Sequence, residues 1–246
     1  MLFLNLPPLS PATYLVSIQM GLILLLFNSC GPANQPKPAN NITDSSQIKI
    51  TAAHKAIAGI KPLLKDGLLI TRSDDDYESL VLQNFSQRER AYSHSGIIFK
   101  EADSFVVYHC MGGKENPGEA CRRDAFNSFV NPLEKTGFGL FKYQLTDTET
   151  VALHKAVQAY HQASIPFDAN FNLANDDSLY CSEMIYKALL QATHNRVVLP
   201  TSTIKNFKPK IPGYKSRQQR YKSFEYIGID DLYLNPFCTE LTRVTY

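Results

Sequence analysis

The stretch from Leu179 to Lys187 places a cysteine at the start of a helix. Four turn-forming residues, Asn175 to Ser178, precede it and end any element that arrives from the N-terminal side. After Cys181, apolar residues recur at helical spacing, at Met184, Ile185 and Ala188. The helix must bury that apolar face, so we expect the Cys181 sulfur to point inward along the edge of a core.

Two interpretations of Cys181 follow from this position. The N-terminus of a helix stabilises negative charge, which lowers the pKa of a thiol and favours the nucleophilic thiolate. Free cysteine is also among the most buried residue types, and a purely structural role is the alternative. The sequence upstream of Cys181 favours the first interpretation.

A predicted β-hairpin upstream carries two histidines. The runs Ser93–Phe99 and Ser104–Cys110 are rich in β-formers and are separated by a few polar residues. A two- or four-residue loop centred between Glu101 and Ala102 would place His94 directly opposite His109, with Cβ atoms about 5 Å apart. A three-residue loop would make the two histidines diagonal neighbours. In both registers the two imidazoles are expected to reach each other.

The N-terminal region has the composition of a targeting segment. Residues 1–30 contain no Asp, Glu, Lys or Arg, and an apolar run from Met20 to Phe27 ends shortly before Cys30. This segment reads as a secretory signal rather than a membrane span. It resembles the lipobox of bacterial lipoproteins, which implies lipidation of Cys30, although Phe27 stands where Leu is usual. A buried N-terminal helix is the alternative.

We expect three regions along the chain. Residues 1–30 form the lipoprotein-type signal, residues 31–46 are rich in Pro and Asn and suit a flexible tether, and residues 47–246 form one folded domain. Within that domain the pattern predicts helices over Ile48–Ile60, from Asp74–Asp76 onward, over Asp124–Val130 and from Thr146 to about Ser164. It predicts strands over Leu68–Thr71, Phe138–Tyr143, Phe224–Tyr233 and Glu240–Tyr246. The helix after Asp76 is expected to turn Tyr77, Leu80, Val81 and Phe85 inward.

Composition limits the choice of partners and of bridges. The chain has 246 residues, 44% of them hydrophobic, and a net charge of +2, which is ordinary for a globular protein and gives no indication of nucleic acid. A basic, aromatic stretch from Lys205 to Lys222 could bind an anionic polymer or a lipid headgroup, although the favoured interpretation is a solvated loop. Cys110 and Cys121 could form a disulfide, leaving Cys238 single, and the sequence leaves this open.

The two motifs together resemble a known family. Ser93-His94-Ser95-Gly96-Ile97, the later His109, and Tyr180-Cys181-Ser182-Glu183 occur in an order similar to that of the YiiX/YebB-like permuted papain-fold hydrolases of the NlpC superfamily. The resemblance spans roughly residues 64–193. It implies an α+β fold of the circularly permuted papain-like type, with an antiparallel sheet packed against helices that include the cysteine-bearing helix.

The resemblance also implies roles for particular residues. Cys181 would be the nucleophile and His94 the general base, with the backbone N–H of Cys181 meeting the oxyanion. The third polar position, often Glu in relatives, is His109 here, and a neutral imidazole cannot stabilise an imidazolium as a carboxylate does. Glu183 is expected to point away from the site and to pair with Lys187 at i+4.

These expectations define a leading function and two alternatives. The leading hypothesis is an exported, membrane-tethered thiol hydrolase of the cell envelope. It would cleave an amide or ester bond in a cell-envelope peptide or an acylated small molecule, without a cofactor. The first alternative is a non-catalytic module that binds cell-envelope peptide or lipid on the same fold. The second is a zinc protein, because two histidines and one cysteine can hold Zn²⁺ with an open position. His154 and His161 lie on one side of a helix and give only weak evidence for a metal.

Overall fold

The computed structural model describes residues 44–113, 118, 120–205 and 223–246. The chain divides into two compact units, Met1–Asn41 and Ile42–Tyr246, and all the described residues belong to the second. Cys30 and most of the basic stretch, residues 206–222, lie outside the described part. Among the described helices, none has the length and apolar character needed to cross a bilayer.

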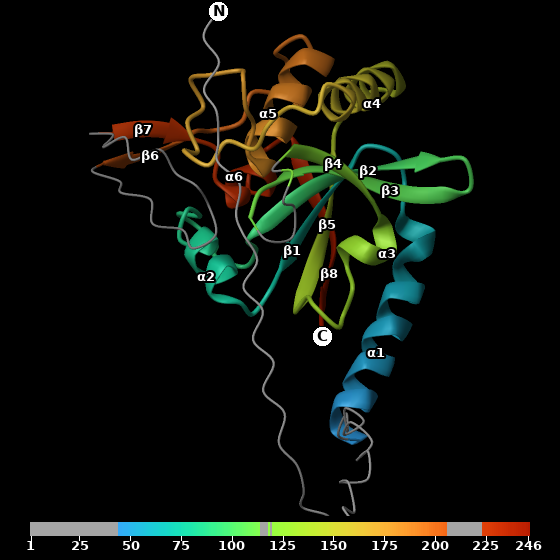
Figure 1. Cartoon of the computed structure of the whole chain (residues 1–246). Coiled ribbons are helices and arrows are strands. Elements are labelled where there is room, and N and C mark those ends of the chain that lie inside the picture. Colours follow the sequence, from blue (N-terminus) through green and yellow to red (C-terminus); the bar gives the residue numbers. More distant parts are fainter. Residues whose placement is uncertain (1–43, 114–117, 119, 206–222) are drawn as a thin grey trace, which may run out of the picture. The chain divides into compact units, whose positions relative to one another are not determined.

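One six-stranded sheet organises the second unit (Figure 1). Every neighbouring pair of strands is antiparallel, and the spatial order is β4-β3-β2-β1-β5-β8. The strands are β1 (Leu68–Ser73), β2 (His94–Glu101), β3 (Ser104–Met111), β4 (Ala120–Ala125), β5 (Gly137–Tyr143) and β8 (Cys238–Thr245). A separate two-stranded sheet pairs β6 (Ser202–Lys205) with β7 (Ser223–Tyr226).

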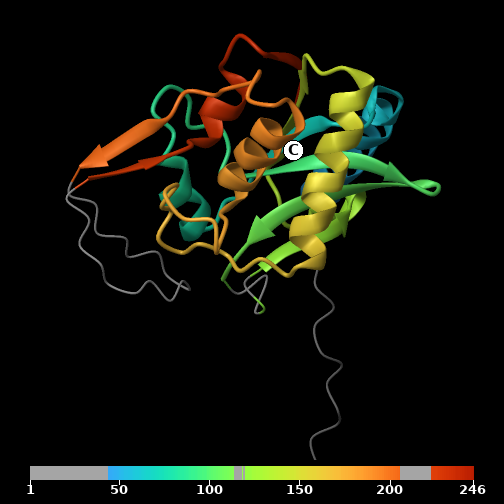
Figure 2. The same cartoon turned by 90° about the horizontal axis from the view of Figure 1, so that it is seen from above.

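Helices cover both faces of the large sheet. They are α1 (Asp44–Ile60), the short 3-10 helix Lys61–Leu63, α2 (Tyr77–Gln83), α3 (Phe126–Phe129), α4 (Asp147–Gln162), α5 (Cys181–Ala192) and α6 (Ile229–Tyr233). Helices α4 and α5 lie side by side over one face (Figure 2). The start of α4 follows the predicted signal, because the Thr146 hydroxyl accepts the Glu149 N–H and the Glu149 carboxylate accepts the Thr146 N–H.

The alternation of side chains along the strands separates two apolar cores. Ile97 and Phe99 of β2 face α4 and α5 and join a core that contains Leu153, Cys181 and Ile185. Ile98 faces the other way, into a core with Phe129 and with Ile57 of α1. Because successive residues of a strand point to opposite faces, His94 shares the Phe129 side of the sheet and Ser95 shares the Cys181 side.

The hairpin of β2 and β3 forms as predicted, but its register differs from the expected one. Ile97 pairs with Tyr108 and Glu101 with Ser104, so the loop consists of Ala102 and Asp103. Ala102 adopts a φ of 50°, as a two-residue hairpin loop requires. Continued along the strands, this register sets His109 opposite Gly96, which makes the two histidines diagonal neighbours and not directly opposed residues.

Three local predictions need correction. The helix expected over Asp124–Val130 is shorter, because Ala120–Ala125 forms β4 and only Phe126–Phe129 is helical. The strand expected over Phe224–Tyr233 is interrupted, because Ile229–Tyr233 forms α6. Leu80, expected to point inward, is 54% exposed. The other predicted helices and strands are present with boundaries shifted by a few residues, and Asp76 caps α2 by accepting the Ser79 N–H at 2.6 Å.

Candidate functional site

The start of α5 holds Cys181 as its first helical residue. The first helical hydrogen bond runs from the Met184 N–H to the Tyr180 carbonyl, so the amides of the preceding turn have no acceptor within the helix. Cys181 is 8% exposed, and the amides of Cys181 and Ser182 lie against its sulfur. The predicted placement of the thiol at a helix N-terminus, on a buried face, is confirmed.

The protonation of this thiol differs from the sequence-based expectation. Burial raises the pKa of Cys181 above its ordinary value, and this effect exceeds the opposing effect of the Ser95 hydroxyl, the Ser95 N–H and the two helix amides. Desolvation disfavours the charged form, and here it outweighs the helix terminus. The prediction of a lowered thiol pKa is therefore wrong, and the resting thiol is protonated at neutral pH.

The two histidines make a direct hydrogen bond. Nε2 of His94 lies 2.8 Å from Nδ1 of His109, and both rings contact Phe129. Since His109 is fully buried and His94 is 7% exposed, the bond is shielded from water. With Nε2 of His94 engaged in this bond, Nδ1 is the ring nitrogen left for chemistry.

A carboxylate that the sequence analysis did not identify completes this arrangement. Oδ2 of Asp124, at the end of β4, lies 3.1 Å from Nε2 of His109, and Arg122 holds the other carboxylate oxygen at 2.9 Å. Burial works against the charged carboxylate, but hydrogen bonds from His109 and Arg122 hold the pKa of Asp124 at about 2. Asp124, His109 and His94 thus form a relay that starts at a carboxylate and ends at His94.

Burial keeps the two imidazoles of the relay neutral, and nearby positive charge adds to this effect. Burial lowers the pKa of His94 well below its usual range, and Arg72, His109 and Lys135 add to the effect. Burial likewise lowers the pKa of His109 to about 4, although Asp124 opposes the shift. The Arg72 guanidinium lies 4.6 Å from the centre of the Phe129 ring, close to both imidazoles.

The thiol and the relay meet at neighbouring residues of β2. Strand β2 pairs with β1 from His94 onward, whereas its pairing with β3 begins at Ile97. The Cys181 sulfur lies against the N–H and hydroxyl of Ser95. The thiol therefore sits one residue along the strand from His94. A hydrogen bond between Cys181 and His94 is not among the contacts of the described residues, so the predicted pairing of these two side chains stays a prediction.

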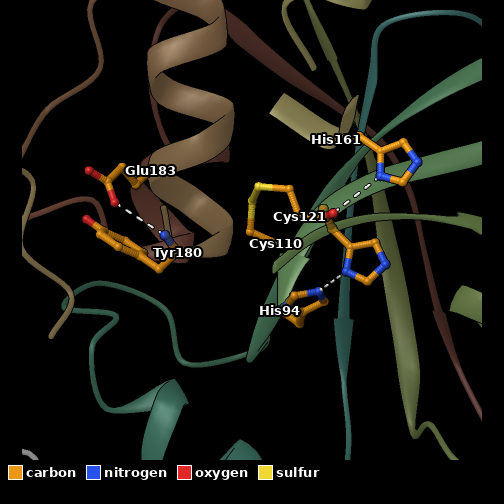
Figure 3. The surroundings of a disulfide bond; sticks show 7 residues. His94, Cys110, Cys121, His161, Tyr180 and Glu183 are labelled. Carbon is orange, nitrogen blue, oxygen red and sulfur yellow. Dashed lines mark hydrogen bonds between the residues drawn. A yellow bond between two sulfur atoms is a disulfide. The ribbon is translucent and has the colours of Figure 1, made fainter. Parts of the chain in front are cut away.

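Glu183 behaves as the sequence predicted. Its carboxylate lies 2.8 Å from Nζ of Lys187, and it also accepts the Tyr180 N–H at 3.3 Å (Figure 3). Burial raises the pKa of Glu183 to about 8, against the effect of Lys187. The side chain fastens the first turn of α5 and does not face the thiol.

A disulfide joins β3 and β4, two of the three strands that carry the relay. Cys110 of β3 and Cys121 of β4 are directly opposed and bonded (Figure 3). This settles the pairing that the sequence left open, and Cys238 is free. The bridge lies on the α5 side of the sheet, while His109 and Asp124, from the same two strands, lie on the other side.

A small pocket opens beside the thiol. It is shallow: its interior volume is about 20 Å³, and its free space is about 290 Å³ when the open solvent at its mouth is included. Its lining residues are Leu82, Phe85, Ser93, Phe171, Tyr180, Cys181, Ser182, Tyr226, Ile227 and Ile229. None of these ten lining residues carries a charge. No local sequence pattern predicts this pocket, because its lining residues come from five separate stretches of the chain.

Other clusters of ionisable residues have structural partners. His154 lies 3.0 Å from Glu101 and stacks on Phe99, and His161 donates to the Cys121 carbonyl at 3.3 Å. Within the described part of the chain, no group of three or more His, Cys, Asp or Glu side chains is placed to hold a metal ion.

Comparisons with known proteins identify the fold. No family model and no curated protein sequence matches the chain. Among solved structures it is similar to the metalloprotein YiiX from Escherichia coli O157:H7, a DUF1105 protein, with a TM-score of 0.55 and 16% identity over 74% of this chain and 98% of that one. The antiparallel sheet, its helices and this similarity confirm the α+β and YiiX-like part of the fold prediction. The chain has a YiiX-like fold.

Proposed function

We propose that this protein is a thiol hydrolase on a permuted papain-like fold, with Cys181 as nucleophile and His94 as base. The observation that supports this is the relay Asp124–His109–His94, which ends one residue from the backbone N–H that touches the Cys181 sulfur. A nucleophile, a base and a group that orients the base are the parts that acyl transfer requires.

The proposed reaction begins from a neutral pair. Nδ1 of His94 takes the thiol proton as the sulfur attacks the carbonyl carbon of an amide, and a C–S bond forms. The tetrahedral oxyanion is met by the helix amides, including that of Cys181. The C–N bond then breaks, the amine leaves with the proton from His94, and water, deprotonated by His94, hydrolyses the thioester to a carboxylic acid and the free thiol.

Asp124 and His109 would act through His94. When His94 takes the proton, its Nε2–H donates to Nδ1 of His109, and Nε2–H of His109 donates to the Asp124 carboxylate. The negative charge of Asp124 then stabilises the imidazolium at a distance of one ring. This supplies the carboxylate that His109 by itself cannot provide.

A metal-dependent activity fits these residues poorly. The structural neighbour is described as a metalloprotein. In this chain the facing nitrogens of His94 and His109 are only 2.8 Å apart and bond each other, so they cannot both be directed at one ion.

A non-catalytic role is the second candidate, and the raised pKa of the Cys181 thiol is the observation that favours it. A protonated, buried thiol beside an apolar pocket would also suit a protein that binds cell-envelope peptide or lipid without turnover. The two candidates differ in whether Cys181 ever becomes acylated.

The deciding experiment uses p-nitrophenyl acetate, whose acyl group is small enough to be independent of the pocket. We expect p-nitrophenol release with acetylated Cys181 detectable by mass spectrometry, complete loss in Cys181→Ala, and a decrease of about 10²- to 10⁴-fold in His94→Gln. Cys238→Ala is the matched thiol control and should be unchanged. Equal rates in wild type and Cys181→Ala would refute the hydrolase and leave the binding role.

We also propose export to the bacterial cell envelope with a lipid anchor at Cys30, facing the periplasm if the source is Gram-negative. The Cys110–Cys121 disulfide supports this, since disulfides persist mainly in oxidising compartments. Radiolabelled palmitate incorporation in bacteria expressing the full chain, compared with Cys30→Ala, would test the anchor.

A further inference from the structure

The pocket beside Cys181 has a composition that restricts the substrate. Four aromatic rings, those of Phe85, Phe171, Tyr180 and Tyr226, form a buried cluster, and Phe85 lies 5.0 Å from Phe171 and 5.5 Å from Tyr226 between ring centres. All four line the pocket. They are four of its ten lining residues.

The polar atoms of the wall are occupied by other protein groups. The Tyr226 hydroxyl donates to the Phe85 carbonyl at 2.8 Å, and the Tyr180 hydroxyl accepts the Ile227 N–H at 2.8 Å. The Ser182 hydroxyl donates to the Ile227 carbonyl at 2.7 Å, and the Ser93 hydroxyl accepts from Ser79 at 2.5 Å. A ligand in the pocket therefore meets an apolar wall and the thiol.

Phe171 is held in the wall against a conformational cost. Its φ of 54° lies in the left-handed region, which a phenylalanine rarely adopts. The buried Asp168 carboxylate accepts the N–H groups of Asn170 at 2.8 Å and Asn172 at 2.7 Å, on either side of Phe171. The loop is thus built to present this ring to the pocket.

The position of the base indicates which part of a substrate the pocket receives. In the proposed reaction the leaving amine takes its proton from His94, and His94 is not among the pocket residues. The acyl group, in contrast, stays bonded to the Cys181 sulfur until water releases it. The amine side is therefore directed toward His94, and the pocket beside the sulfur is left for the acyl side.

We propose that the pocket is the acyl subsite of the enzyme and takes a compact, uncharged, apolar group, aliphatic or aromatic, attached to the scissile carbonyl. This inference rests on the proposed function. It selects amides of apolar acids and excludes substrates with a carboxylate or ammonium next to the cleaved bond, because no charged residue lines the pocket to compensate their desolvation.

The test compares three alkylating reagents on the folded wild-type protein: iodoacetamide, iodoacetate and N-benzyl iodoacetamide. Labelling of Cys181 is followed by mass spectrometry, and each rate is divided by the rate with N-acetylcysteine. We expect N-benzyl iodoacetamide to react at least about tenfold faster than iodoacetamide, from the apolar area that the benzyl group buries, and iodoacetate to react at least about tenfold slower.

Variants of the wall then locate the preference. Phe171→Ala should remove most of the benzyl advantage, whereas Phe171→Leu should keep it. Leu82→Asp, at a half-buried position in α2, should reduce labelling by the benzyl reagent more than labelling by iodoacetamide. If a variant fails to fold, as judged by circular dichroism, the wild-type ratios still decide.

The outcomes separate the two proposals. Labelling by iodoacetamide with no preference for the benzyl reagent, or with a preference for iodoacetate, would overturn the acyl subsite and leave the hydrolase proposal intact. Cys181 that none of the reagents labels in the folded protein, but that all label after unfolding, would overturn both.

Discussion

The carboxylate of Asp124 lies 3.1 Å from Nε2 of His109, and its negative charge can stabilise a protonated histidine pair. Without it, a proton taken up by His94 would be faced only by the positive charges of Arg72, Lys135 and Arg122. Asp124 is therefore the residue through which the basicity of His94 can be tested without touching either histidine.

We expect Asp124→Asn to lower turnover of p-nitrophenyl acetate by about ten- to a hundredfold, less than the loss of His94 itself, because the carboxylate acts through His109. Steady-state rates over pH 5 to 9 measure the effect. Asp103→Asn, in the exposed hairpin loop, is the control and should match wild type. A wild-type rate in Asp124→Asn would remove Asp124 from the mechanism.

The lowered pKa of His109 predicts a loss of stability in mild acid. In the unfolded chain His109 binds a proton below about pH 6.5, whereas in the folded protein it does so only near pH 4, so protons favour unfolding between these values. Proton uptake by His109 in the unfolded chain should therefore lower the free energy of unfolding by about 2 kcal/mol between pH 7 and pH 5. Urea denaturation should show that His109→Gln loses about that much less stability than wild type over the same range. Equal losses in the two proteins would mean that His109 does not titrate as described.

The Cys110–Cys121 bridge predicts a redox-dependent stability. A disulfide that closes a loop with a sequence separation of 11 residues contributes about 3 kcal/mol in the chain-entropy account. Reduction with a phosphine should lower the free energy of unfolding of the wild type by roughly this amount. The double variant Cys110→Ala/Cys121→Ala should be insensitive to the reductant, and a reductant effect that persists in it would assign the change to another group.

Gly96, in the first motif, predicts a steric effect on the relay. A methyl group at this position would lie 2.4 Å from Cγ1 of Val107 and 3.4 Å from Cβ of His109. We expect Gly96→Ala to destabilise the protein by about 1–3 kcal/mol and to reduce turnover by displacing His109. The control is Gly59→Ala in α1, where an added methyl meets nothing within 4 Å and should stabilise the helix by about 0.5–1 kcal/mol. Similar stabilities for the two variants would contradict the packing around Gly96.

The sequence was informative where one local pattern decides the structure. The cysteine-bearing helix, the hairpin, the capped start of α4 and the Glu183–Lys187 pair each depend on residues close together in the chain. The hairpin register was not predictable in the same way. Its loop centres on Ala102 and Asp103, and an alanine at a φ of 50° is not a residue that marks such a turn.

Asp124 was missed because its segment was assigned to a helix. A signal for it existed: if Cys110 and Cys121 are taken as directly opposed on antiparallel strands, Asp124 falls opposite Val107, diagonal to His109 and on the same face. A local sequence pattern could not predict the pKa of the thiol, because this pKa depends on how deeply α5 and the sheet bury the sulfur. The pocket depends on five separate stretches of the chain, and no pattern within any one of them predicts it.

The division of the two apolar cores has a consequence for how this protein would lose activity. The relay belongs to the layer that contains Phe129 and the thiol to the layer beneath α4 and α5, and the two meet at the neighbouring residues His94 and Ser95 of β2. The rate of the proposed reaction would then depend on how the two layers are aligned with each other. Partial loosening of either layer, detectable as faster amide exchange in α1 or in α4, should abolish the proposed activity before the chain unfolds.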